Sequence, residues 1–526
     1  MAGDVIEQIK IHIDNDENFL LSGGAGSGKT HALTEVLKYI FEKDPIASVA
    51  CITYTNVAAN EIKERSPYEN LRVSTIHDFL WNAVKDYQKN LKTSVVELIN
   101  EKGITYKGEL ELNTDYFKDK SIQYKEYKKL EEGIISHDEV LKIANYMFKT
   151  YPLLCNILND KYQYILIDEY QDTELQVVEI FLEFIQNDNK RKNIIGLFGD
   201  SMQSIYEKGV GNIRKYIEAE QGVVKEVIKP DNYRCSEAVI NLLNNIRGDI
   251  KQKPSGQNLK GSAIFMYSNS NDIKISDIKK DKVFSSWDFS DVNDTKELYL
   301  THKLIAKEKG FLEILESYSN KDRLIGDNKD KLAKHLFKIQ EIIDLYETRN
   351  YNEFVKKTDF KINKLSQKND LRNSIEKLKD INGKNIEDII NLSDKLNLIK
   401  IDDSLKEYIK EKTELYEKIK ILPYRQIVNI YEFEKGNSPY STQHGVKGAE
   451  FNNVFVVLDN GRWNQYNFQY LFEETGKESI IERTKKIFYV CCSRAKDNLV
   501  VFFYKPTPIT ITQAKNWFGD KNIIEI

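Results

Sequence analysis

The sequence predicts an α/β protein with parallel sheets, in which two α/β domains each carry a helical insertion. Three observations lead to this prediction. Short apolar runs end in glycine, hydroxyl or carboxylate residues, as the buried strands of a parallel sheet do. Stretches with helical periodicity follow these runs. Two long segments, 81–160 and 311–433, are instead rich in charged residues and have little β-strand signal.

These changes in composition give the predicted domain boundaries. No internal repeat and no low-complexity linker stands out in the 526 residues. The first α/β domain comprises 1–80 and 161–235 with the insertion 81–160, and the second comprises 236–310 and 434–526 with the insertion 311–433.

Composition narrows the class of protein. Hydrophobic residues make up 41% and charged residues 30%, as in an ordinary globular protein, and no apolar run reaches membrane-spanning length. The first residues lack the features of a signal peptide, so we expect a cytoplasmic protein with no membrane partner. The five cysteines are scattered, which indicates neither a disulfide framework nor a zinc site. A net charge of −4 means that any polyanion must bind in a local groove.

The first strand, ending at Phe19–Leu21, leads into a phosphate loop. The loop fits G-x-x-x-x-G-K-[ST], and a helix is expected from His31 to Glu42. Glycines let backbone N–H groups converge on a phosphate, the lysine supplies a cation, and the threonine hydroxyl suits Mg²⁺. A glycine-rich turn without a ligand is the alternative, which the strand–loop–helix context disfavours. The loop residues are Gly23, Gly24, Ala25, Gly26, Ser27, Gly28, Lys29 and Thr30.

Two further strands end in small polar residues. The first, Ser48–Asn56, precedes a helix over Val57–Arg65, and its last residues could bind backbone phosphates or could simply cap that helix. The second strand-like stretch, Leu71–Phe79, contains Thr75 and His77. In the insertion that follows, Ile135–Met147 has helical spacing after a serine cap.

The next strand, Tyr164–Asp168, delivers two carboxylates at its carboxyl end. Asp168 suits Mg²⁺ held through water or a nucleotide, and Glu169 suits general-base activation of water. A further strand, Asn193–Asp200, is followed by Gln203, which is placed to sense a γ-phosphate.

Aromatic and cationic residues precede the later helices and strands. Tyr233 can stack on a base, and Arg234 can stabilise a transferring phosphoryl group or form a salt bridge. A second arginine, Arg494, precedes a buried strand at Asn498–Tyr504. The lysines of the second insertion alternate with acids, which favours a solvated helix surface over a DNA-binding patch. Other strands of the second domain are expected at Gly261–Tyr267, Glu297–Thr301 and Asn453–Leu458.

In this order, the motifs resemble those of the UvrD/Rep-type superfamily 1A helicases. The resemblance implies two RecA-like motor domains with ATP and Mg²⁺ in the cleft between them, and a DNA-dependent ATPase that translocates 3'-to-5' on single-stranded DNA. It rests on the phosphate loop, Asp168–Thr173, Gly199–Tyr206, Asn232–Arg234, His444–Phe451 and Tyr489–Ala495.

The resemblance also implies roles for individual residues. Gln8 and Tyr233 would contact adenine, and Glu450 the ribose. Lys29 and Thr30 would hold the phosphates and Mg²⁺, with Asp168 on the metal and Glu169 as the base. Gln203, Arg234 and Arg494 would contact the γ-phosphate. The residues implied to bind single-stranded DNA are Tyr54, Thr55, Asn56, Thr75, His77, Tyr206 and His444.

One position departs from the larger family members. Lys208 stands where they carry a tryptophan that stacks on DNA, so the chain alone is expected to unwind duplex weakly. In its compactness the chain looks more like the small helicases of bacterial defence systems such as Gabija. The competing hypothesis is therefore a DNA- or nucleotide-sensing ATPase subunit that regulates a partner nuclease. A phosphate-loop kinase is disfavoured, because a kinase has no need of the C-terminal arginine motifs.

Overall fold

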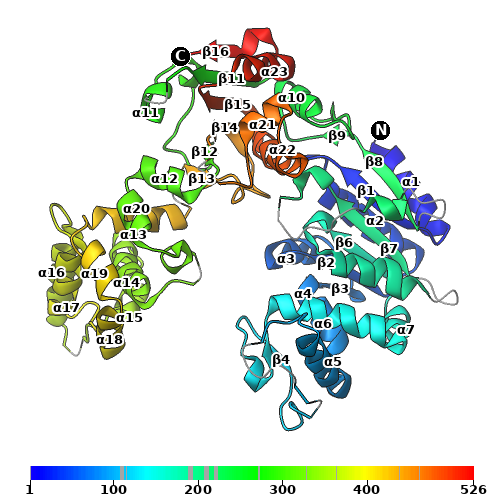
Figure 1. The fold of residues 1–526 in the computed structure, drawn as a ribbon, viewed down its shortest axis with the longest axis horizontal. Coiled ribbons are helices and arrows are strands. Elements are labelled where there is room, and N and C mark those ends of the chain that lie inside the picture. The colour runs from blue at the N-terminus through cyan, green and yellow to red at the C-terminus, as the bar shows by residue number, and fades with distance from the viewer. Residues whose placement is uncertain are drawn as a thin grey trace. The chain divides into compact units, whose positions relative to one another are not determined.

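Contacts between residues divide the computed structural model into two compact units (Figure 1). The first comprises Met1–Ser262 and Glu482–Asp497, and the second comprises Ala263–Ile481 and Asn498–Ile526. No helix in the described part of the chain is long and apolar enough to cross a membrane. The structure describes residues 2–106, 112–113, 115–187, 193–205, 213–217, 223–270, 273–326, 328–362, 364–436, 439–460 and 463–526.

The first unit is built on a six-stranded sheet with the order β3-β2-β6-β7-β1-β8. All of its neighbouring strands run parallel. Their carboxyl ends therefore meet at one edge, where α/β proteins bind ligands. The strands are β1 (Asn18–Gly23), β2 (Val49–Thr53), β3 (Leu71–Thr75), β6 (Tyr164–Asp168), β7 (Ile194–Gly199) and β8 (Val224–Lys229).

Helices cover both faces of this sheet, so its strands are apolar on both sides. Along β6, Ile165 and Ile167 pack in one core with α4 to α8, and Leu166 packs in the opposite core with α1, α2 and α3. The chain between β3 and β6 is mainly helical and is called the helical segment below. Two short paired strands, β4 (Gln123–Tyr124) and β5 (Ile134–Ile135), lie in it. The helices are α1 (Ala2–Asp14), α2 (Lys29–Lys43), α3 (Asn56–Arg65), α4 (Ile76–Val84), α5 (Gln88–Asn100), α6 (His137–Thr150), α7 (Pro152–Lys161), α8 (Leu175–Glu179), α9 (Arg214–Ile217), α10 (Glu237–Ile246) and most of α22 (Glu478–Cys492).

The second unit repeats the topology of the first. Its sheet has the order β13-β12-β14-β15-β11-β16. Numbered by their order along the chain, the strands of both sheets follow the order 3-2-4-5-1-6. The strands are β11 (Ser262–Ser268), β12 (Thr295–Tyr299), β13 (Tyr440–Thr442), β14 (Phe451–Leu458), β15 (Ala495–Tyr504) and β16 (Ile523–Glu525), and a separate pair is formed by β9 (Asp231–Asn232) and β10 (Lys253–Pro254) in the first unit.

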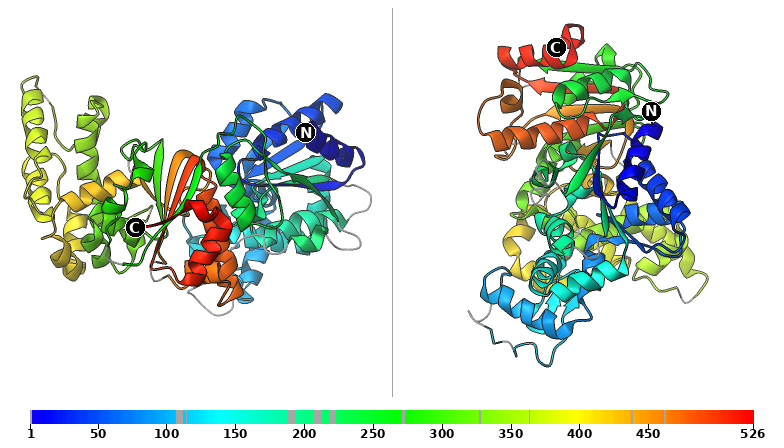
Figure 2. Two further views of the ribbon diagram at one scale, coloured as in Figure 1. Left: turned by 90° about the horizontal axis from the view of Figure 1, so that it is seen from above. Right: turned by 90° about the vertical axis from the view of Figure 1, so that its right-hand side faces the viewer.

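A group of helices between β12 and β13 lies to one side of the second sheet (Figures 1 and 2). Their apolar side chains form one core with that sheet. The group comprises α12 (His302–Lys309), α13 (Leu312–Ser317), α14 (Lys331–Glu347), α15 (Tyr351–Lys357), α16 (Gln367–Lys379), α17 (Ile386–Lys395), α18 (Asp403–Glu411), α19 (Thr413–Ile419) and α20 (Arg425–Glu434); α11 (Ile275–Ile278), α21 (Phe468–Glu473) and α23 (Pro508–Phe518) complete the unit.

The predicted fold class, α/β with two parallel sheets, is confirmed. The expected strand Leu71–Phe79 is wrong in its second half: β3 ends at Thr75, whose hydroxyl accepts a hydrogen bond from the Asp78 N–H and so begins α4. The serine cap of α6 is confirmed, since Ser136 forms a reciprocal capping box with Glu139. The four-part domain division stays a prediction.

Candidate functional site

The phosphate loop lies between β1 and α2. Gly26 and Gly28 have φ angles of 73° and 76°, which only glycine adopts without strain. The Lys29 ammonium donates hydrogen bonds to the carbonyls of Gly23 at 3.1 Å and Gly24 at 3.4 Å. The Ser27 hydroxyl is buried and has no hydrogen-bond partner among the described residues. This loop therefore presents a lysine and an unpaired buried hydroxyl, which suit a phosphate ligand.

The segment around β9 holds the loop in place. Asn232, fully buried, donates to the carbonyl of Ala25 at 3.1 Å, and the Tyr233 N–H donates to the carbonyl of Gly26 at 2.8 Å. A Cβ atom at Gly26 would lie 2.6 Å from the Cβ of Arg234, so the loop approaches this segment too closely for any side chain. The half-exposed Tyr233 ring lies beside Gly28, which places an aromatic face next to the loop.

Two carboxylates lie at the end of β6. Asp168 is buried; burial raises the pKa of its carboxyl, the neighbouring Glu169 carboxylate raises that pKa further, and the Lys29 cation opposes both effects. Glu169 has a φ of 51°, an uncommon left-handed conformation for a residue other than glycine. Its carboxylate accepts a hydrogen bond from the side-chain amide of Gln171. This backbone geometry and this bond fix where the carboxylate points.

Gln203 belongs to a buried polar network at the end of β7. Its amide N–H donates to the Asp200 carboxylate at 3.0 Å, and its carbonyl oxygen accepts from Arg494 at 3.4 Å. The fully buried side chain of Gln171 accepts from the Asp200 N–H at 3.0 Å. Gln171 thus joins the carboxylates after β6 to the sensor residue after β7.

Arg494 is almost completely buried at the end of α22. Its guanidinium donates to the Val490 carbonyl at 3.0 Å and to the Ser493 hydroxyl at 2.9 Å. Burial, with a contribution from the nearby Arg234 guanidinium, lowers the pKa of Arg494 to about 10. The structure therefore brings the predicted residues Gln203, Arg234 and Arg494 together in the first unit. Arg494 hydrogen-bonds to Gln203, and the Arg234 charge acts on it.

Sequence analysis missed a second network that supports the loop. Arg247, fully buried, pairs with Asp200 at 3.1 Å and with Asp249 at 2.8 Å, and donates to the Tyr489 hydroxyl at 2.7 Å. That hydroxyl accepts the Ala25 N–H at 3.2 Å. Tyr489 belongs to a recognised motif, but no spacing in the sequence indicates that Arg247 reaches it.

A groove of about 600 Å³ lies at the carboxyl ends of β2 and β3. Five of the seven residues predicted to bind DNA line it, together with Tyr124, Lys125, Glu126 and His137 from the helical segment and Asp78. Thr55 also caps α3, as the capping alternative for that strand end predicts, and Thr75 caps α4. The five predicted residues are Tyr54, Thr55, Asn56, Thr75 and His77.

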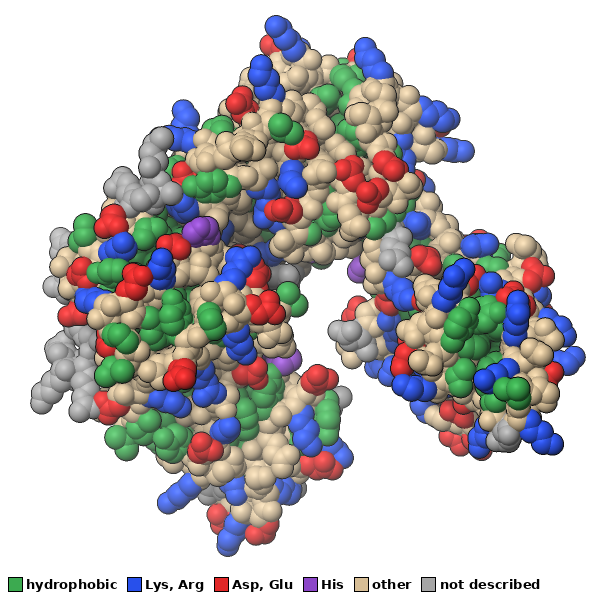
Figure 3. Space-filling view, turned by 180° about the vertical axis from the view of Figure 1, so that it is seen from behind, with side chains coloured by type: hydrophobic (Ala, Val, Ile, Leu, Met, Phe, Trp, Pro, Cys, Tyr) green, Lys and Arg blue, Asp and Glu red, His purple; other side chains and the backbone are tan. Residues whose placement is uncertain are grey.

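Two histidines meet in this groove. The rings of His77 and His137 lie 4.8 Å apart, and the Tyr124 hydroxyl hydrogen-bonds to His137. Burial lowers the pKa of His77 to about 4, with His137 contributing, so His77 is neutral at pH 7. Lys/Arg and Asp/Glu side chains are interspersed over the face of the molecule that Figure 3 shows. The candidate nucleic-acid site is this groove, because it gathers the predicted DNA-binding residues.

Comparisons with known proteins agree with this geometry. Residues 7–209 match the AAA domain model, a range that includes the phosphate loop, Asp168–Glu169 and Gln203. The chain is 29% identical to the Gabija protein GajB of Bacillus cereus, over 97% of this chain and 96% of that protein. It is 25% identical to the ATP-dependent DNA helicase PcrA of Staphylococcus aureus, over 47% of this chain and 41% of PcrA.

The chain belongs to the UvrD/PcrA-like superfamily 1 helicases. PcrA of Staphylococcus epidermidis matches similarly, with 25% identity over 45% of this chain and 39% of that protein. The AAA domain implies nucleotide binding, and the helicase relatives imply ATPase activity.

Of the remaining predicted residues, the structure describes Gln8, His444 and Glu450. Gln8 is on the exposed side of α1, and Glu450 and His444 belong to the second unit. Tyr206 and Lys208 lie outside the described residues.

His444 is part of an aromatic cluster in the second unit. Its imidazole hydrogen-bonds to the Tyr466 hydroxyl at 2.7 Å, and the partly exposed Trp463 ring lies 5.6 Å from it. By strand order, β12 and β13 are the counterparts of β2 and β3. His444 therefore follows its strand much as His77 follows β3, and Thr301, which caps α12, corresponds to Thr55. Sequence analysis missed Thr301, because the correspondence appears only in the topology.

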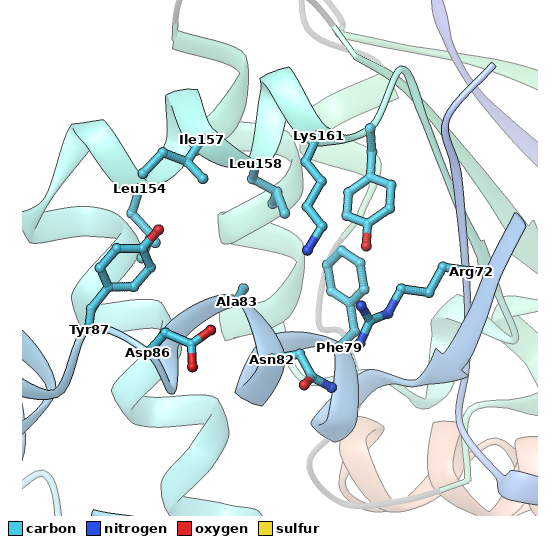
Figure 4. Close-up of a pocket in the computed structure, with 11 residues that line it drawn as sticks. Arg72, Phe79, Asn82, Ala83, Asp86, Tyr87, Leu154, Ile157, Leu158 and Lys161 are labelled. Carbon is cyan, nitrogen blue, oxygen red and sulfur yellow. The ribbon is translucent and has the colours of Figure 1, made fainter. Parts of the chain in front are cut away.

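A smaller cavity of about 100 Å³ lies between α4 and α7 and contains none of the predicted site residues. Arg72 and Lys161 both extend toward Phe79 there, with Leu158 beside Lys161 and Leu154 nearer to Tyr87 (Figure 4). Its small volume and separate lining set it apart from both the loop and the groove.

Proposed function

We propose that this helicase-family chain is a DNA-dependent ATPase that translocates on single-stranded DNA with 3'-to-5' polarity and separates duplex strands, in bacterial repair or anti-phage defence. The observation that carries this proposal is the groove, which gathers residues from two strand ends and the helical segment. Hydroxyl and amide groups at strand ends suit backbone phosphates, and the exposed Tyr54 ring suits a base. The predicted four-part domain division belongs to the same proposal.

The loop supports Mg²⁺–ATP as the nucleotide. Lys29 would hold the β- and γ-phosphates, and Thr30 and Asp168 would bind Mg²⁺ directly or through water. The unpaired Ser27 hydroxyl fits a phosphate oxygen. When bound, Mg²⁺ neutralises charge on the phosphates. Gln8 and Tyr233 would contact adenine, and Glu450 the ribose.

The carboxylate pair supports hydrolysis. Glu169 would accept a proton from the attacking water, since Gln171 and the left-handed backbone hold its carboxylate in one direction. Gln203, Arg234 and Arg494 would stabilise the negative charge that develops on the transferring phosphoryl group. The pairing of Gln203 with both Asp200 and Arg494 supports a role in which these residues act together.

Replacing Tyr54 by Ala tests the groove. Because a base stacked on an aromatic ring contributes ~1 to 3 kcal/mol, we expect DNA affinity to fall by about 5- to 150-fold. The DNA concentration that half-activates ATP hydrolysis should rise to match, and hydrolysis without DNA should stay unchanged. Both are measured at one salt concentration, because phosphate contacts depend on salt.

Tyr127→Ala is the matched control. Tyr127 is also exposed and lies two residues from a groove residue, Lys125, but does not line the groove. Equal losses in both variants, or none in Tyr54→Ala, would contradict the groove as the DNA site. Absence of DNA-stimulated hydrolysis in the wild type would contradict the proposed function as a whole.

A second candidate function is a DNA- or nucleotide-sensing ATPase subunit that regulates a partner nuclease and unwinds little itself. Lys208 in place of the stacking tryptophan and the near full-length similarity to a Gabija protein favour it. Strand displacement per ATP hydrolysed, measured for the chain alone and together with the proposed partner nuclease, separates the two. Long, processive unwinding by the chain alone would exclude the second function.

A further inference from the structure

The second unit contains a cavity of about 690 Å³ at the carboxyl ends of its strands. Residues at the ends of β12, β14 and β15 line it, together with α12 and the segment Ile273–Ile275 that follows β11. The volume falls within the range of ~300 to 1,000 Å³ that is typical of small-molecule sites. None of the residues assigned above to ATP or DNA lines this cavity.

The cavity occupies the place that the nucleotide-site residues occupy in the first unit. In strand order, β11, β12, β14 and β15 are the counterparts of β1, β2, β6 and β7. In the first unit these strand ends carry the phosphate loop, Thr55, Asp168–Glu169 and Asp200. Open α/β sheets bind their ligands at this edge, so this edge is where a ligand of the second unit would be expected to bind.

The cavity is lined by three lysines, Lys274, Lys307 and Lys505, which come from three separate segments. In the described part of the chain, none of the three forms a salt bridge with a carboxylate. Lys505 has a φ of 46°, an uncommon conformation for a side-chain-bearing residue, and its N–H donates to the Ser268 carbonyl at 2.8 Å. A lysine ammonium at a strand end can donate charge-assisted hydrogen bonds to an anion.

Other groups in the cavity suit a sugar and a base. Asp459 follows β14 directly, and carboxylates at strand ends bind ribose hydroxyls in related folds. Tyr504 provides an aromatic face, with the apolar Leu304 also in the lining. Burial raises the pKa of Tyr504, and Glu308 and Asp459 raise it further, so the phenol remains neutral beside both carboxylates.

We propose that this cavity is a second binding site, separate from the phosphate loop, for a nucleoside phosphate. Lys274, Lys307 and Lys505 contact the phosphates, Asp459 and Glu308 the ribose hydroxyls, and Tyr504 the base. The proposal does not depend on DNA binding or on hydrolysis at the loop.

Counting bound nucleotides tests it directly. With radiolabelled ADP and Mg²⁺ in equilibrium dialysis, we expect two nucleotides per wild-type chain. We expect one in Lys29→Ala, one in the triple variant Lys274→Ala, Lys307→Ala, Lys505→Ala, and none when all four changes are combined. Single substitution of Lys505 should weaken the second site about tenfold or more, as loss of a charge-assisted contact does.

The triple variant Lys400→Ala, Lys410→Ala, Lys418→Ala is the matched control, because these lysines are also exposed in the second unit but lie outside the cavity. It should bind two nucleotides. The KM for ATP hydrolysis of the cavity variant should equal that of the wild type, which shows that the loop has folded. One nucleotide per wild-type chain would overturn the proposal. So would two in the cavity variant, or a cavity that binds a single-stranded oligonucleotide and no ADP.

Discussion

The Tyr489 hydroxyl connects the phosphate loop to the buried Arg247 network through hydrogen bonds to both. The substitution Tyr489→Phe removes only that hydroxyl. The ring stays, with its contact to the Arg247 guanidinium at 5.1 Å. The Ala25 N–H, now 3.2 Å from the hydroxyl, loses its acceptor, and Arg247 loses its contact of 2.7 Å. Asp200 and Asp249 still pair with Arg247, so its charge is not left unpaired.

The size of the effect follows from these contacts. A buried donor left without an acceptor costs ~1 to 3 kcal/mol, and a lost hydrogen bond to a charged group contributes ~1.5 to 3 kcal/mol. Because these terms overlap at one hydroxyl, we expect the first unit to lose about 2 to 4 kcal/mol in free energy of unfolding. Since Ala25 belongs to the phosphate loop, kcat/KM for ATP should also fall, mainly through KM.

Urea unfolding and steady-state ATP hydrolysis measure the two effects. Tyr424→Phe is the matched control: Tyr424 is fully buried in the second unit, and its hydroxyl has no hydrogen-bond partner among the described residues. Removing an unpaired buried hydroxyl should be neutral or slightly stabilising. The argument fails if Tyr489→Phe unfolds at the wild-type urea concentration and hydrolyses ATP with the wild-type KM.

Three further predictions follow from the site. Glu169→Gln should keep ATP binding but slow turnover by ~10²-fold or more, since it removes the base; near-normal turnover would refute that role. Gly199→Ala should lower the free energy of unfolding, measured in urea, by about 1 to 3 kcal/mol, because its Cβ would collide with the side-chain amide oxygen of Gln171. Gly248→Ala, with no atom within 4 Å, is its control. The pKa of His77 is about 4 in the folded chain against an ordinary 6.5, so the unfolded chain binds the proton more readily. Stability should therefore fall as the pH drops from 6.5 toward 4, and His77→Gln should reduce this dependence in unfolding midpoints measured across pH.

The sequence was sufficient for features fixed by local pattern. The strand–loop–helix arrangement around Gly23–Thr30, the buried strand before Asp168–Glu169 and the serine cap of α6 all depend on residues adjacent in the chain, and each forms as predicted. The edge strand β8 was missed, because its outward positions carry charges such as Lys225 and interrupt the apolar pattern.

Features that depend on distant pairing could not be predicted in this way. Arg247 and Tyr489 are far apart in the chain and meet only once the fold has formed. The shared strand order of the two sheets also has no counterpart in a sequence repeat, because topology requires only apolar strands of suitable length, which many sequences satisfy. The groove combines local and distant features. Its residues were predicted one by one from local motifs, but only the parallel sheet brings them together.

The repeated topology also indicates why we expect ATP hydrolysis at the phosphate loop and not at the cavity proposed in the second unit. After β11 the sequence from Asn269 to Lys274 contains no glycine, so the backbone lacks the residues that form a phosphate-cradling loop. After β14 the chain carries Asp459 and Asn460 instead of a carboxylate pair, and the Asn460 side chain already accepts the Phe468 N–H at 2.9 Å. The cavity of the second unit can therefore hold a nucleotide through its lysines, but it has no counterpart of Glu169, the proposed general base. It follows that Lys29→Ala should abolish ATP hydrolysis while one nucleotide per chain remains bound. Residual hydrolysis in that variant, removed by the three cavity substitutions, would contradict this division between the sites.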